Sequence, residues 1–352
     1  MAKVGIIGTG WGARTQVPAF RLAGLSVAGI AGRDAERTRW LGGELGVEPF
    51  ADWRALAVLP DVDLVSVVTP PGEHLEMTRT ALEAGKHVLS EKPTALNAGQ
   101  AREMAQAARA RPRQLALIDH ELRFLPSWRL ARERRGEIGR IRYAEVRYAS
   151  PSRADPFRPW NWWSDAEQGG GIWGAAGSHF VDALRYFVGE IEEVQAILHT
   201  FIAERDSAEG RKRVTSDDFA AVHVRLEGGS LASLLLSVVA GLDEETTLTL
   251  HGEKGAIRLV GEDLFLARAG GGWITEHRGS PFDVPGNTPG GPFGSGTVHL
   301  GRALAAALDA GDREALSPAA TFEDGLAQQR VLDAARRSQA NGGRWEKVHA
   351  VG

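Results

Sequence analysis

The amino-terminal strand, the glycine-rich turn after it and the helix that follows restrict the fold of this chain more than any other segment. Residues 3–7 form a short apolar run that leads directly into Gly8, Thr9, Gly10, Trp11, Gly12 and Ala13. In this G-x-G-x-x-A spacing, Gly8 permits a tight turn, Gly10 lets the backbone approach a pyrophosphate, and Ala13 packs the helix on the strand. The unpaired N–H groups at the start of that helix attract anions. We therefore expect these six residues to bind a dinucleotide, the alternative being a glycine-rich turn of another α/β fold.

The second strand, residues 26–31, ends in a sequence that bears on the choice of cofactor. Gly32, Arg33 and Asp34 follow it. An acid at the strand tip binds the ribose 2′-hydroxyl of NAD, whereas a nearby arginine accommodates the 2′-phosphate of NADP. Gly32 leaves space and Arg33 offers a planar set of donors, so the sequence favours NADP, with NAD as the alternative. Asp34 is equally suited to capping the next helix, and Arg33 to pairing with Glu36 on the surface.

Strands and helices alternate over the first 120 or so residues. Residues 63–69, 86–90 and 115–119 read as apolar strands, and residues 74–84 and 98–110 as helices. This alternation predicts a doubly wound parallel sheet, whose ligands lie beyond the carboxyl ends of its strands. The residues expected at those ends are Gly8, Gly32, Thr69, Glu91 and His120.

The triplet Glu91-Lys92-Pro93 places an ionisable amine at such a strand end. Pro93 has a fixed φ and disfavours helical geometry at Lys92, so the amine leaves the strand in a defined direction. A solvated lysine at a strand end is the ordinary alternative. Because the triplet follows a strand of the dinucleotide-binding sheet, we expect Lys92 to exchange protons with a ligand and Glu91 to steady a ribose or the lysine.

The pattern changes after Pro126. Seven segments read as strands, several of them alternating in polarity, which predicts a large, mainly antiparallel sheet with one covered face. They are residues 138–149, 193–202, 220–226, 230–239, 246–251, 256–260 and 263–268. We expect its outer face, with Leu234, Leu236 and Val238, to form a homodimer or homotetramer interface. Residues 270–296, dense in Gly and Pro, read as a mobile arm or loop, and residues 301–310 and 322–341 as helices.

Length and composition are consistent with two soluble domains. A chain of 352 residues predicts a nucleotide-binding domain over residues 1–122 and a second domain over residues 123–352. The net charge of −4 provides no basic surface for nucleic acid, and the absence of cysteine excludes disulfides and thiolate ligands. We expect no metal, because the ten histidines contain no H-x-x-x-H pair on a plausible helix. With no signal-like or membrane-length apolar segment, the expected location is cytoplasmic.

Four motifs together resemble the Gfo/Idh/MocA family of oxidoreductases. They are Gly8-x-Gly10-x-x-Ala13, Thr69-Pro70-Pro71 with His74 after it, Ala84-Gly85-Lys86-His87-Val88 leading to Glu91-Lys92-Pro93, and Gly177-Ser178-His179-Phe180-Val181-Asp182. They occur in the order and spacing of that family, and the match covers nearly the whole chain. The resemblance implies a Rossmann domain joined to an α/β domain with a large open antiparallel sheet. It also implies hydride exchange between NAD or NADP and sugars, cyclitols or related polyols.

The resemblance also implies roles for individual residues. It implies that Lys92 lies beside the nicotinamide and the substrate carbinol as proton donor or acceptor. His179 matches the histidine of the family's G-x-H-x-x-D motif, which implies a catalytic and substrate-binding role. Thr69, Pro70 and His74 match the family's cofactor-binding segment.

One position departs from the family pattern. Members that oxidise inositol-like substrates carry an aspartate one helical turn before the matching histidine, and this chain has Ala175 there. If residues 171–188 form a helix, Ala175 shares a face with His179, so the usual carboxylate partner is missing. Asp182 could orient the imidazole or pair with Arg185. We therefore assign the main proton transfer to Lys92, and His179 either contributes to the site or packs between domains.

The segment from Arg158 to Asp165 is rich in tryptophan. Trp162 and Trp163 offer flat faces on which a polyol ring could stack, with Asn161 beside them for hydroxyl groups. The alternative is that these side chains pack a domain junction. His120, with Glu121 and Arg123, is a further candidate for substrate contact because it follows the last strand of the first sheet.

These observations predict an NAD(P)-dependent oxidoreductase that acts on the CH–OH groups of a small sugar or polyol. Two other classes have the same cofactor motif. A non-catalytic dinucleotide-sensing protein would bind cofactor without turnover, and an NAD-dependent glycosidase of the same family would release sugar without net reduction. The sequence determines neither the substrate nor the direction of the reaction.

Overall fold

The chain forms two compact units, which are described separately. A computed structural model describes residues 1–280 and 291–349. Unit 1 contains the described residues of Met1–Ala95, Gly99–Leu125 and Ser280–Leu326. Unit 2 contains the described residues of Leu96–Ala98, Pro126–Gly279 and Ala327–Gly352.

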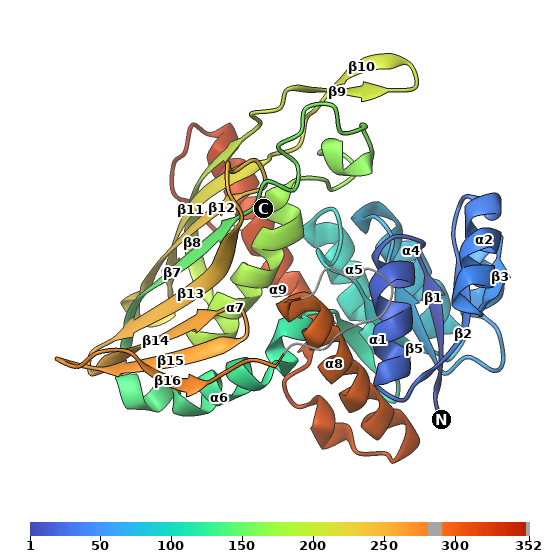
Figure 1. The fold of residues 1–352 in the computed structure, drawn as a ribbon, viewed down its shortest axis with the longest axis horizontal. Helices are drawn as coiled ribbons and strands as arrows, with labels where there is room; N and C mark the ends of the chain where they lie inside the picture. The colour runs from blue at the N-terminus through green and yellow to red at the C-terminus, as the bar shows by residue number, and fades with distance from the viewer. Residues whose placement is uncertain (281–290, 350–352) are drawn as a thin grey trace. The chain divides into compact units, whose positions relative to one another are not determined.

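Unit 1 is built on a seven-stranded sheet in the order β17-β6-β5-β4-β1-β2-β3. Figure 1 labels β1, β2, β3 and β5 of this sheet. Its strands are β1 Lys3–Ile7, β2 Ser26–Ala31, β3 Glu48–Phe50, β4 Leu64–Val67, β5 His87–Ser90, β6 Ala116–Ile118 and β17 Ala320–Thr321. All neighbours pair in parallel except β17, which runs antiparallel to β6. Strands β1 to β6 have the order of a dinucleotide-binding fold, so the predicted doubly wound sheet is confirmed.

Five helices of unit 1 lie between successive strands of its sheet, and a sixth, α8, precedes β17. They are α1 Val17–Leu22, α2 Ala35–Leu45, α3 Trp53–Ala57, α4 His74–Glu83, α5 Ala98–Arg109 and α8 Pro292–Asp309. A π-helical turn, Gly12–Gln16, precedes α1 directly. The short elements β3 and α3 are absent from the sequence prediction, because three and five residues are too few to produce a periodic pattern.

The described residues of Ser280–Leu326 belong to unit 1, whereas the sequence analysis expected them in a second domain over residues 123–352. Leu300 and Leu304 of α8 share an apolar core with Phe20 of α1. Gly301 permits this packing, because a Cβ there would lie 2.7 Å from the Cβ of Ala23.

The expected loop over residues 270–296 is also partly wrong. It contains β16, Ile274–His277, and the first turns of α8. Residues 281–290 lie outside the described residues.

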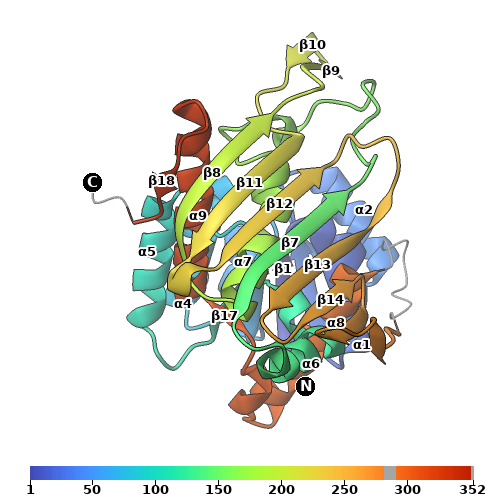
Figure 2. The same ribbon diagram turned by 90° about the vertical axis from the view of Figure 1, so that its left-hand side faces the viewer.

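Unit 2 is built on a nine-stranded sheet in the order β16-β15-β14-β13-β7-β12-β11-β8-β18. Besides β16, its strands are β7 Ile141–Ala149, β8 Ile191–His199, β11 Phe219–Leu226, β12 Leu231–Ser237, β13 Glu244–Gly252, β14 Gly255–Val260, β15 Asp263–Arg268 and β18 Glu346–Lys347. Among these neighbours only β7 and β12 pair in parallel. The predicted large and mainly antiparallel sheet is therefore confirmed (Figure 2). A separate hairpin joins β9, Glu204–Ser207, to β10, Gly210–Arg213.

Helices cover one face of this sheet. They include α7, Ser178–Phe187, and the part of α9, Phe322–Ala340, that lies in unit 2 (Figure 2). The short helix α6, Pro126–Arg134, also belongs to unit 2. Ser338 of α9 accepts a hydrogen bond at 2.9 Å from the backbone of Ala196 in β8. The side chains between this face of the sheet and the helices form the core of unit 2.

The expectation that Leu234, Leu236 and Val238 form the outer face is wrong, because all three are buried. The residues that point outward from β12 are Leu231 and Leu235, which are 52% and 40% exposed. In the sequence of β12, LASLLLS, one alternating set is wholly apolar and the other contains Ser233 and Ser237, so the period-2 pattern points to Leu234 and Leu236 as buried, and the expectation chose the wrong face.

Candidate active site

The glycine-rich turn after β1 has the geometry that a dinucleotide needs. Gly8 has φ 141°, and a Cβ there would lie 2.1 Å from the carbonyl oxygen of Val68, so this position requires glycine. At Gly10, in contrast, no atom lies within 4 Å of the place that a Cβ would occupy. Gly12 packs closely on Ile6, because a Cβ at Gly12 would lie 2.8 Å from Cγ2 of Ile6. The backbone at Gly10 is thus open to a pyrophosphate, which fits the role expected of the turn.

The tip of β2 carries no carboxylate. A Cβ at Gly32 would lie 2.5 Å from Cγ2 of Thr9 and 2.7 Å from the hydroxyl of Thr38, so the site excludes a side chain. Asp34 caps α2, where its carboxylate accepts a hydrogen bond at 3.0 Å from the backbone N–H of Arg37. An acid that would bind a ribose 2′-hydroxyl is therefore missing from the tip.

Arg33 is a surface residue beside this tip. Its side chain is 75% exposed, and its guanidinium lies 3.5 Å from the carboxylate of Glu73 rather than pairing with Glu36 as the alternative reading required. An exposed pair of this kind contributes little to stability. The guanidinium can therefore exchange Glu73 for another anion at small cost.

His74 joins two loops at the carboxyl end of the sheet. Its Nε2 lies 2.8 Å from the carbonyl oxygen of Thr69, after β4, and its Nδ1 lies 3.2 Å from that of Thr94, after β5. The ring is completely buried, and burial lowers its pKa below the usual value. His74 thus fixes the loop that carries Thr69 and Pro70, both half-buried, with its ring nitrogens directed at backbone carbonyls.

The Glu91-Lys92-Pro93 turn follows β5, and its Lys92–Pro93 bond is cis. Lys92 is half-buried, whereas Glu91 is buried. The carboxylate of Glu91 accepts hydrogen bonds at 3.3 Å from the amide of Gln16 and at 3.3 Å from the backbone N–H of Lys92. Because Gln16 lies in the π turn after the glycine loop, this contact connects the expected cofactor turn directly to the lysine turn.

A buried polar cluster extends from this contact, and the sequence analysis missed most of it. The Gln16 amide also donates to Asp119 at 2.9 Å, and its oxygen accepts from the hydroxyl of Ser66 at 2.6 Å. Burial raises the pKa of Asp119 well above its usual value, and the nearby Glu91 raises it further. Burial also raises the pKa of Glu91, which the charge of Lys92 partly offsets. The signal in the sequence that could have indicated this cluster is Ser66, a polar residue inside an otherwise apolar parallel strand.

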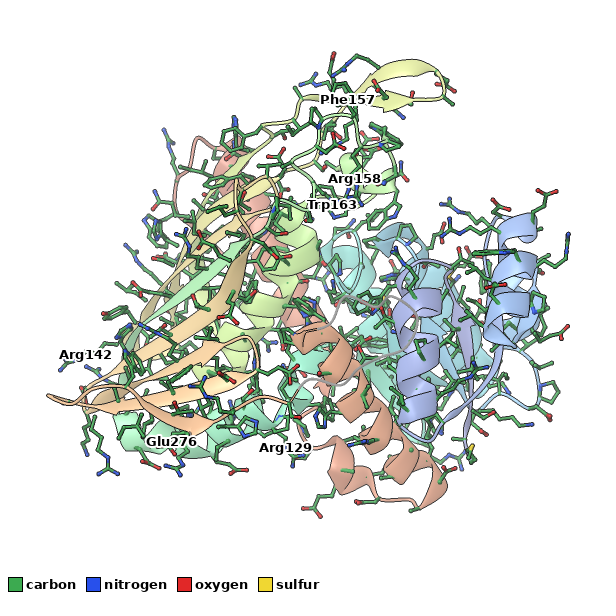
Figure 3. All side chains as sticks on the ribbon, in the orientation of Figure 1. Arg129, Arg142, Phe157, Arg158, Trp163 and Glu276 are labelled. Carbon is green, nitrogen blue, oxygen red and sulfur yellow. The ribbon has the colours of Figure 1, made fainter. Side chains whose placement is uncertain are left out.

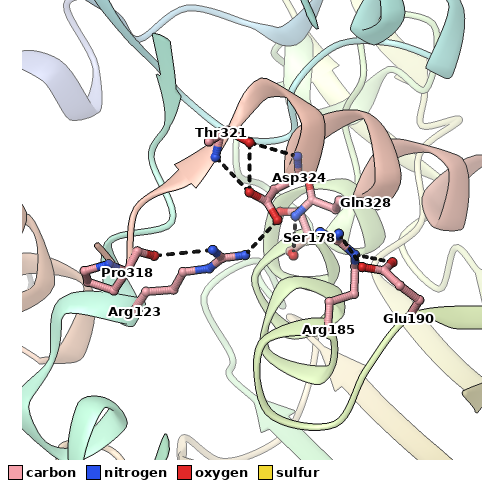
Figure 4. A network of polar contacts seen from close by, with 8 residues as sticks. All are labelled: Arg123, Ser178, Arg185, Glu190, Pro318, Thr321, Asp324 and Gln328. Carbon is pink, nitrogen blue, oxygen red and sulfur yellow. Dashed lines mark hydrogen bonds and ion pairs between the residues drawn. The ribbon is translucent and has the colours of Figure 1, made fainter. Parts of the chain in front are cut away.

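The residues after β6 are buried within unit 1. His120 is 2% exposed, and it begins the short helix Glu121–Phe124. Arg123 donates to the carbonyl of Pro318 at 3.3 Å and lies 3.5 Å from the carboxylate of Asp324 (Figure 4). Arg123 therefore connects this helix to the segment before α9 and to the first turn of α9. Neither His120 nor Arg123 presents a large exposed surface to a substrate.

His179 lies near the start of α7 in unit 2, and it is buried. The expected continuous helix over residues 171–188 is wrong at its first turn, because Trp173–Gly177 is π-helical. Gly177 permits this turn: a Cβ there would lie 2.4 Å from the indole ring of Trp173. Arg185 pairs with Glu190, with nitrogen–oxygen distances of 2.8 and 2.7 Å (Figure 4).

Asp217 anchors the π turn that precedes α7. Its carboxylate accepts a hydrogen bond at 2.7 Å from the backbone N–H of Trp173. Burial raises the pKa of Asp217 to about 6. The turn that carries Ala175 is thus held by an acidic residue which the sequence analysis did not identify.

The tryptophan-rich segment serves partly as packing in unit 2. Trp163 is buried, and the guanidinium of Arg153 lies 3.7 Å from the centre of its ring. The Trp160 indole donates to the carbonyl of Arg213 at 3.1 Å. Phe157, Arg158 and Trp163 lie toward the end of unit 2 that carries the β9–β10 hairpin (Figure 3). Trp162, which is half-buried, is the better placed of the two expected substrate contacts.

Over residues 1–280 and 291–349, no group of three or more His, Asp or Glu side chains is arranged to hold a metal ion. In the same ranges, every helix is too short or too polar to cross a membrane.

Comparisons with known proteins cover both halves of the chain. Residues 2–118 match a family described as oxidoreductases with an NAD-binding Rossmann fold, and residues 131–258 match the GFO/IDH/MocA C-terminal domain. An oxidoreductase from Synechocystis sp. is 32% identical over 268 residues, which cover 74% of this chain and 72% of that protein. Human glucose-fructose oxidoreductase domain-containing protein 2 is 31% identical over 374 residues, covering 99% of this chain and 94% of that protein. Among solved structures, levoglucosan dehydrogenase in complex with NADH and levoglucosan has a TM-score of 0.87 and 26% identity, covering 99% of this chain and 100% of that one.

Proposed function

The chain belongs to the Gfo/Idh/MocA family of oxidoreductases, and from that premise we propose that it transfers a hydride between NAD(P) and a CH–OH carbon of a sugar or polyol. The hydrogen bond between Gln16 and Glu91 carries this proposal. It joins the helix after the open glycine turn to the turn that presents Lys92. One sheet edge thereby supports both a cofactor-binding loop and a proton-exchanging amine.

The residues proposed to hold the cofactor lie at the carboxyl ends of β1, β2, β4 and β5. The open backbone at Gly10 and the helix after it suit the pyrophosphate. The loop after β4, with Thr69 and Pro70, and the Glu91-Lys92 turn border the same sheet edge. When bound, the nicotinamide supplies or accepts the hydride.

We further propose a preference for NADP over NAD. Two observations support it: Gly32 leaves no room for an acid at the strand tip, and Asp34 is used as a helix cap. Arg33 lies beside the tip, and Arg37 donates to the carbonyl of Thr9 at 3.4 Å, so two guanidinium groups border the glycine turn. A 2′-phosphate would replace Glu73 as the partner of Arg33.

Lys92 is the proposed proton donor and acceptor. In oxidation its Nζ takes the proton of the substrate hydroxyl as the C–H hydride leaves, and in reduction it returns that proton to the developing alkoxide. Glu91 orients the lysine turn through the backbone N–H of Lys92. His179, from unit 2, is proposed to take part in substrate binding and catalysis, with Ala175 leaving the family's aspartate position without a carboxylate.

The proposed substrate is a small, uncharged polyhydroxylated ring. The support is the similarity to levoglucosan dehydrogenase, which was solved with NADH and levoglucosan. In unit 2, the half-buried Trp162 follows Asn161, whose side chain accepts from the backbone of Trp163 at 3.0 Å. An aromatic face held by such a turn is suited to the C–H face of a sugar.

We also propose that the outer face of the unit 2 sheet forms a homodimer or homotetramer interface. Tyr143 and Leu231 are directly opposite on β7 and β12, and both are exposed. Leu235 and Ile197 are both paired with Ala221, so they lie on either side of it. These exposed apolar side chains cross four strands of the sheet, which favours a protein partner over solvent.

A screen of sugars, cyclitols and keto-sugars with NAD(H) and NADP(H), followed by the nicotinamide absorbance, tests the proposed reaction. We expect substrate-dependent change in that absorbance with at least one compound, levoglucosan being the first to test. Calorimetric cofactor binding without any turnover across the panel would instead indicate a dinucleotide-sensing protein. Release of sugar from a glycoside without net reduction would indicate the glycosidase.

A further inference from the structure

The cluster of Gln16, Ser66, Glu91 and Asp119 contains two buried carboxyl groups that share one amide. One N–H of Gln16 points to Glu91 at 3.3 Å and the other to Asp119 at 2.9 Å. The hydroxyl of Ser66 donates to the Gln16 oxygen at 2.6 Å, which orients the amide so that its donors face the acids. The four residues come from the π turn before α1, from β4, and from the ends of β5 and β6.

Oδ1 of Asp119 is the atom that this arrangement leaves open. It is buried, and among the described residues no donor reaches it. The amide nitrogen of Gln16 donates to both carboxyl groups, at 3.3 Å to Glu91 and at 2.9 Å to Asp119, so the two acids lie close together in a buried site. Two ionised carboxylates there would repel each other, and neither would have a proton to donate. A single proton on Oδ1 would remove that repulsion and give this buried atom a hydrogen bond to make.

The surrounding charges decide which acid holds the proton. Glu91 is adjacent to Lys92, whose charge favours the ionised form of Glu91. Asp119 faces two other carboxyl groups, Glu91 and Glu121, and both disfavour its ionised form. Lys92 acts on Asp119 in the opposite sense, but less strongly than burial and the two carboxyl groups.

We propose that Asp119 is protonated in the native protein and donates a hydrogen bond to an ionised Glu91, so that the buried pair carries one negative charge beside Lys92. Asp119 is then a positioning residue: it acts on Lys92 through Glu91. This consequence for catalysis rests on the proposed role of Lys92. The protonation state itself does not depend on that role.

The infrared spectrum of the full chain without cofactor or substrate tests the protonation directly. A protonated carboxyl group has a C=O stretching band that a carboxylate lacks, and carboxyl ¹³C labelling of aspartate shifts it. Because the pKa of Asp217 is about 6, this residue would also contribute near neutral pH. The measurement is therefore made in the Asp217→Asn protein, at pH about 7, where ordinary aspartates are ionised.

We expect one protonated aspartate band in Asp217→Asn and its loss in Asp217→Asn/Asp119→Asn. Absence of the band in the first protein would overturn the proposal, as would its survival in the second. If the double variant does not fold, Glu91→Gln in the Asp217→Asn protein replaces it. A band that shifts when its acceptor becomes a neutral amide supports the proposal, and an unchanged band contradicts it.

The kcat values of two Asp119 variants distinguish a positioning role of this residue from a role in packing alone. Asparagine keeps an acceptor for Gln16 and a donor for Glu91, so Asp119→Asn should retain kcat within about threefold. Asp119→Ala leaves Glu91 without that donor, and we expect a loss of about tenfold or more, as for a lost hydrogen bond to a charged group. Equal losses in the two variants would refute the positioning role. If no compound in the substrate screen is turned over, the infrared result still decides the protonation.

Discussion

Because Gly32 has no side chain, the tip of β2 carries no acid that could bind a cofactor ribose. Any Cβ at this position would overlap Thr9 and Thr38, so an acid at the tip is excluded sterically. The next residue, Arg33, is exposed, and among the described residues it forms an ion pair with Glu73. At the scale of residues, we therefore propose that the choice of cofactor depends on Arg33, which can be tested by removing this arginine.

Arg33→Ala should weaken NADPH binding by about tenfold or more and leave NADH binding nearly unchanged. The expected loss corresponds to one charge-assisted hydrogen bond to the 2′-phosphate. Fluorescence or calorimetric titration with both coenzymes measures it. Arg39→Ala, on the helix α2 that follows Arg33 and also exposed, is the matched control. Equal losses for the two coenzymes would remove the 2′-phosphate from the role of Arg33.

Gly10 and Gly8 make a second residue-level comparison, because they differ in their surroundings. Gly10→Val places a side chain in open space, so the unfolding temperature should stay close to wild type while cofactor affinity falls. Gly8→Ala puts a Cβ against the carbonyl of Val68 and strains a backbone of positive φ, so the protein itself should be destabilised. Thermal unfolding and coenzyme titration of both variants distinguish the two effects. Undiminished cofactor affinity in a folded Gly10→Val would show that the dinucleotide binds elsewhere.

At the scale of elements, the start of α7 shows how a buried acid can hold a functional helix. At the start of the π turn Trp173–Gly177, the backbone N–H of Trp173 donates a hydrogen bond to the carboxylate of Asp217. A sequence pattern gives no sign of this turn, because π and α geometry differ by one residue in the hydrogen-bond register and share the same apolar side chains. Asp217 was equally hidden, since its partner is a backbone group 44 positions away in the chain.

The raised pKa of Asp217 predicts how stability changes with pH. The native carboxyl group, with a pKa of about 6 against 3.8 in the unfolded chain, binds its proton more tightly in the folded state. Its contribution is therefore favourable at low pH and is lost as the pH rises from about 4 to about 6. The full effect is about 3 kcal/mol at most.

Asp217→Asn should remove that dependence, because the amide stays neutral and keeps an acceptor for Trp173. The free energy of unfolding of the variant minus that of wild type should increase from pH 4 to pH 7, as followed by urea unfolding. Asp165→Asn is the control. Asp165 is a less buried acid of the same unit, and hydrogen bonds lower its pKa. A difference between Asp217→Asn and wild type that stays constant over this range would contradict the shift.

At the scale of the whole molecule, the sequence predicts the first sheet well because its strands are apolar on both faces and each ends at a turn with a recognisable residue. It could not show that the described residues of Ser280–Leu326 belong to unit 1, since the pairing of β17 with β6 connects segments about two hundred residues apart and leaves no local pattern. The buried acid pair was missed for the same reason. Glu91, Asp119 and Gln16 meet only after three strands and a helix have assembled.

The outer face of the unit 2 sheet gives a prediction for the assembly. Ile197→Glu with Leu235→Glu should shift the protein from a dimer or tetramer toward the monomer, because charges would be buried in an apolar contact. Analytical ultracentrifugation over a range of concentrations measures the shift. Leu22→Glu, at an exposed position of α1, should leave the assembly unchanged. A wild-type protein that is already monomeric at the highest concentration would refute the interface.

The central claim is that Lys92 moves the proton in a hydride transfer at the edge of the unit 1 sheet. The rate of the nicotinamide absorbance change at saturating coenzyme and substrate, compared between wild type and Lys92→Met, tests it most directly. We predict a loss of about 100-fold or more in kcat, the range for removal of a general acid or base, with coenzyme affinity within about threefold of wild type. A Lys92→Met protein that turns over at the wild-type rate would contradict the account.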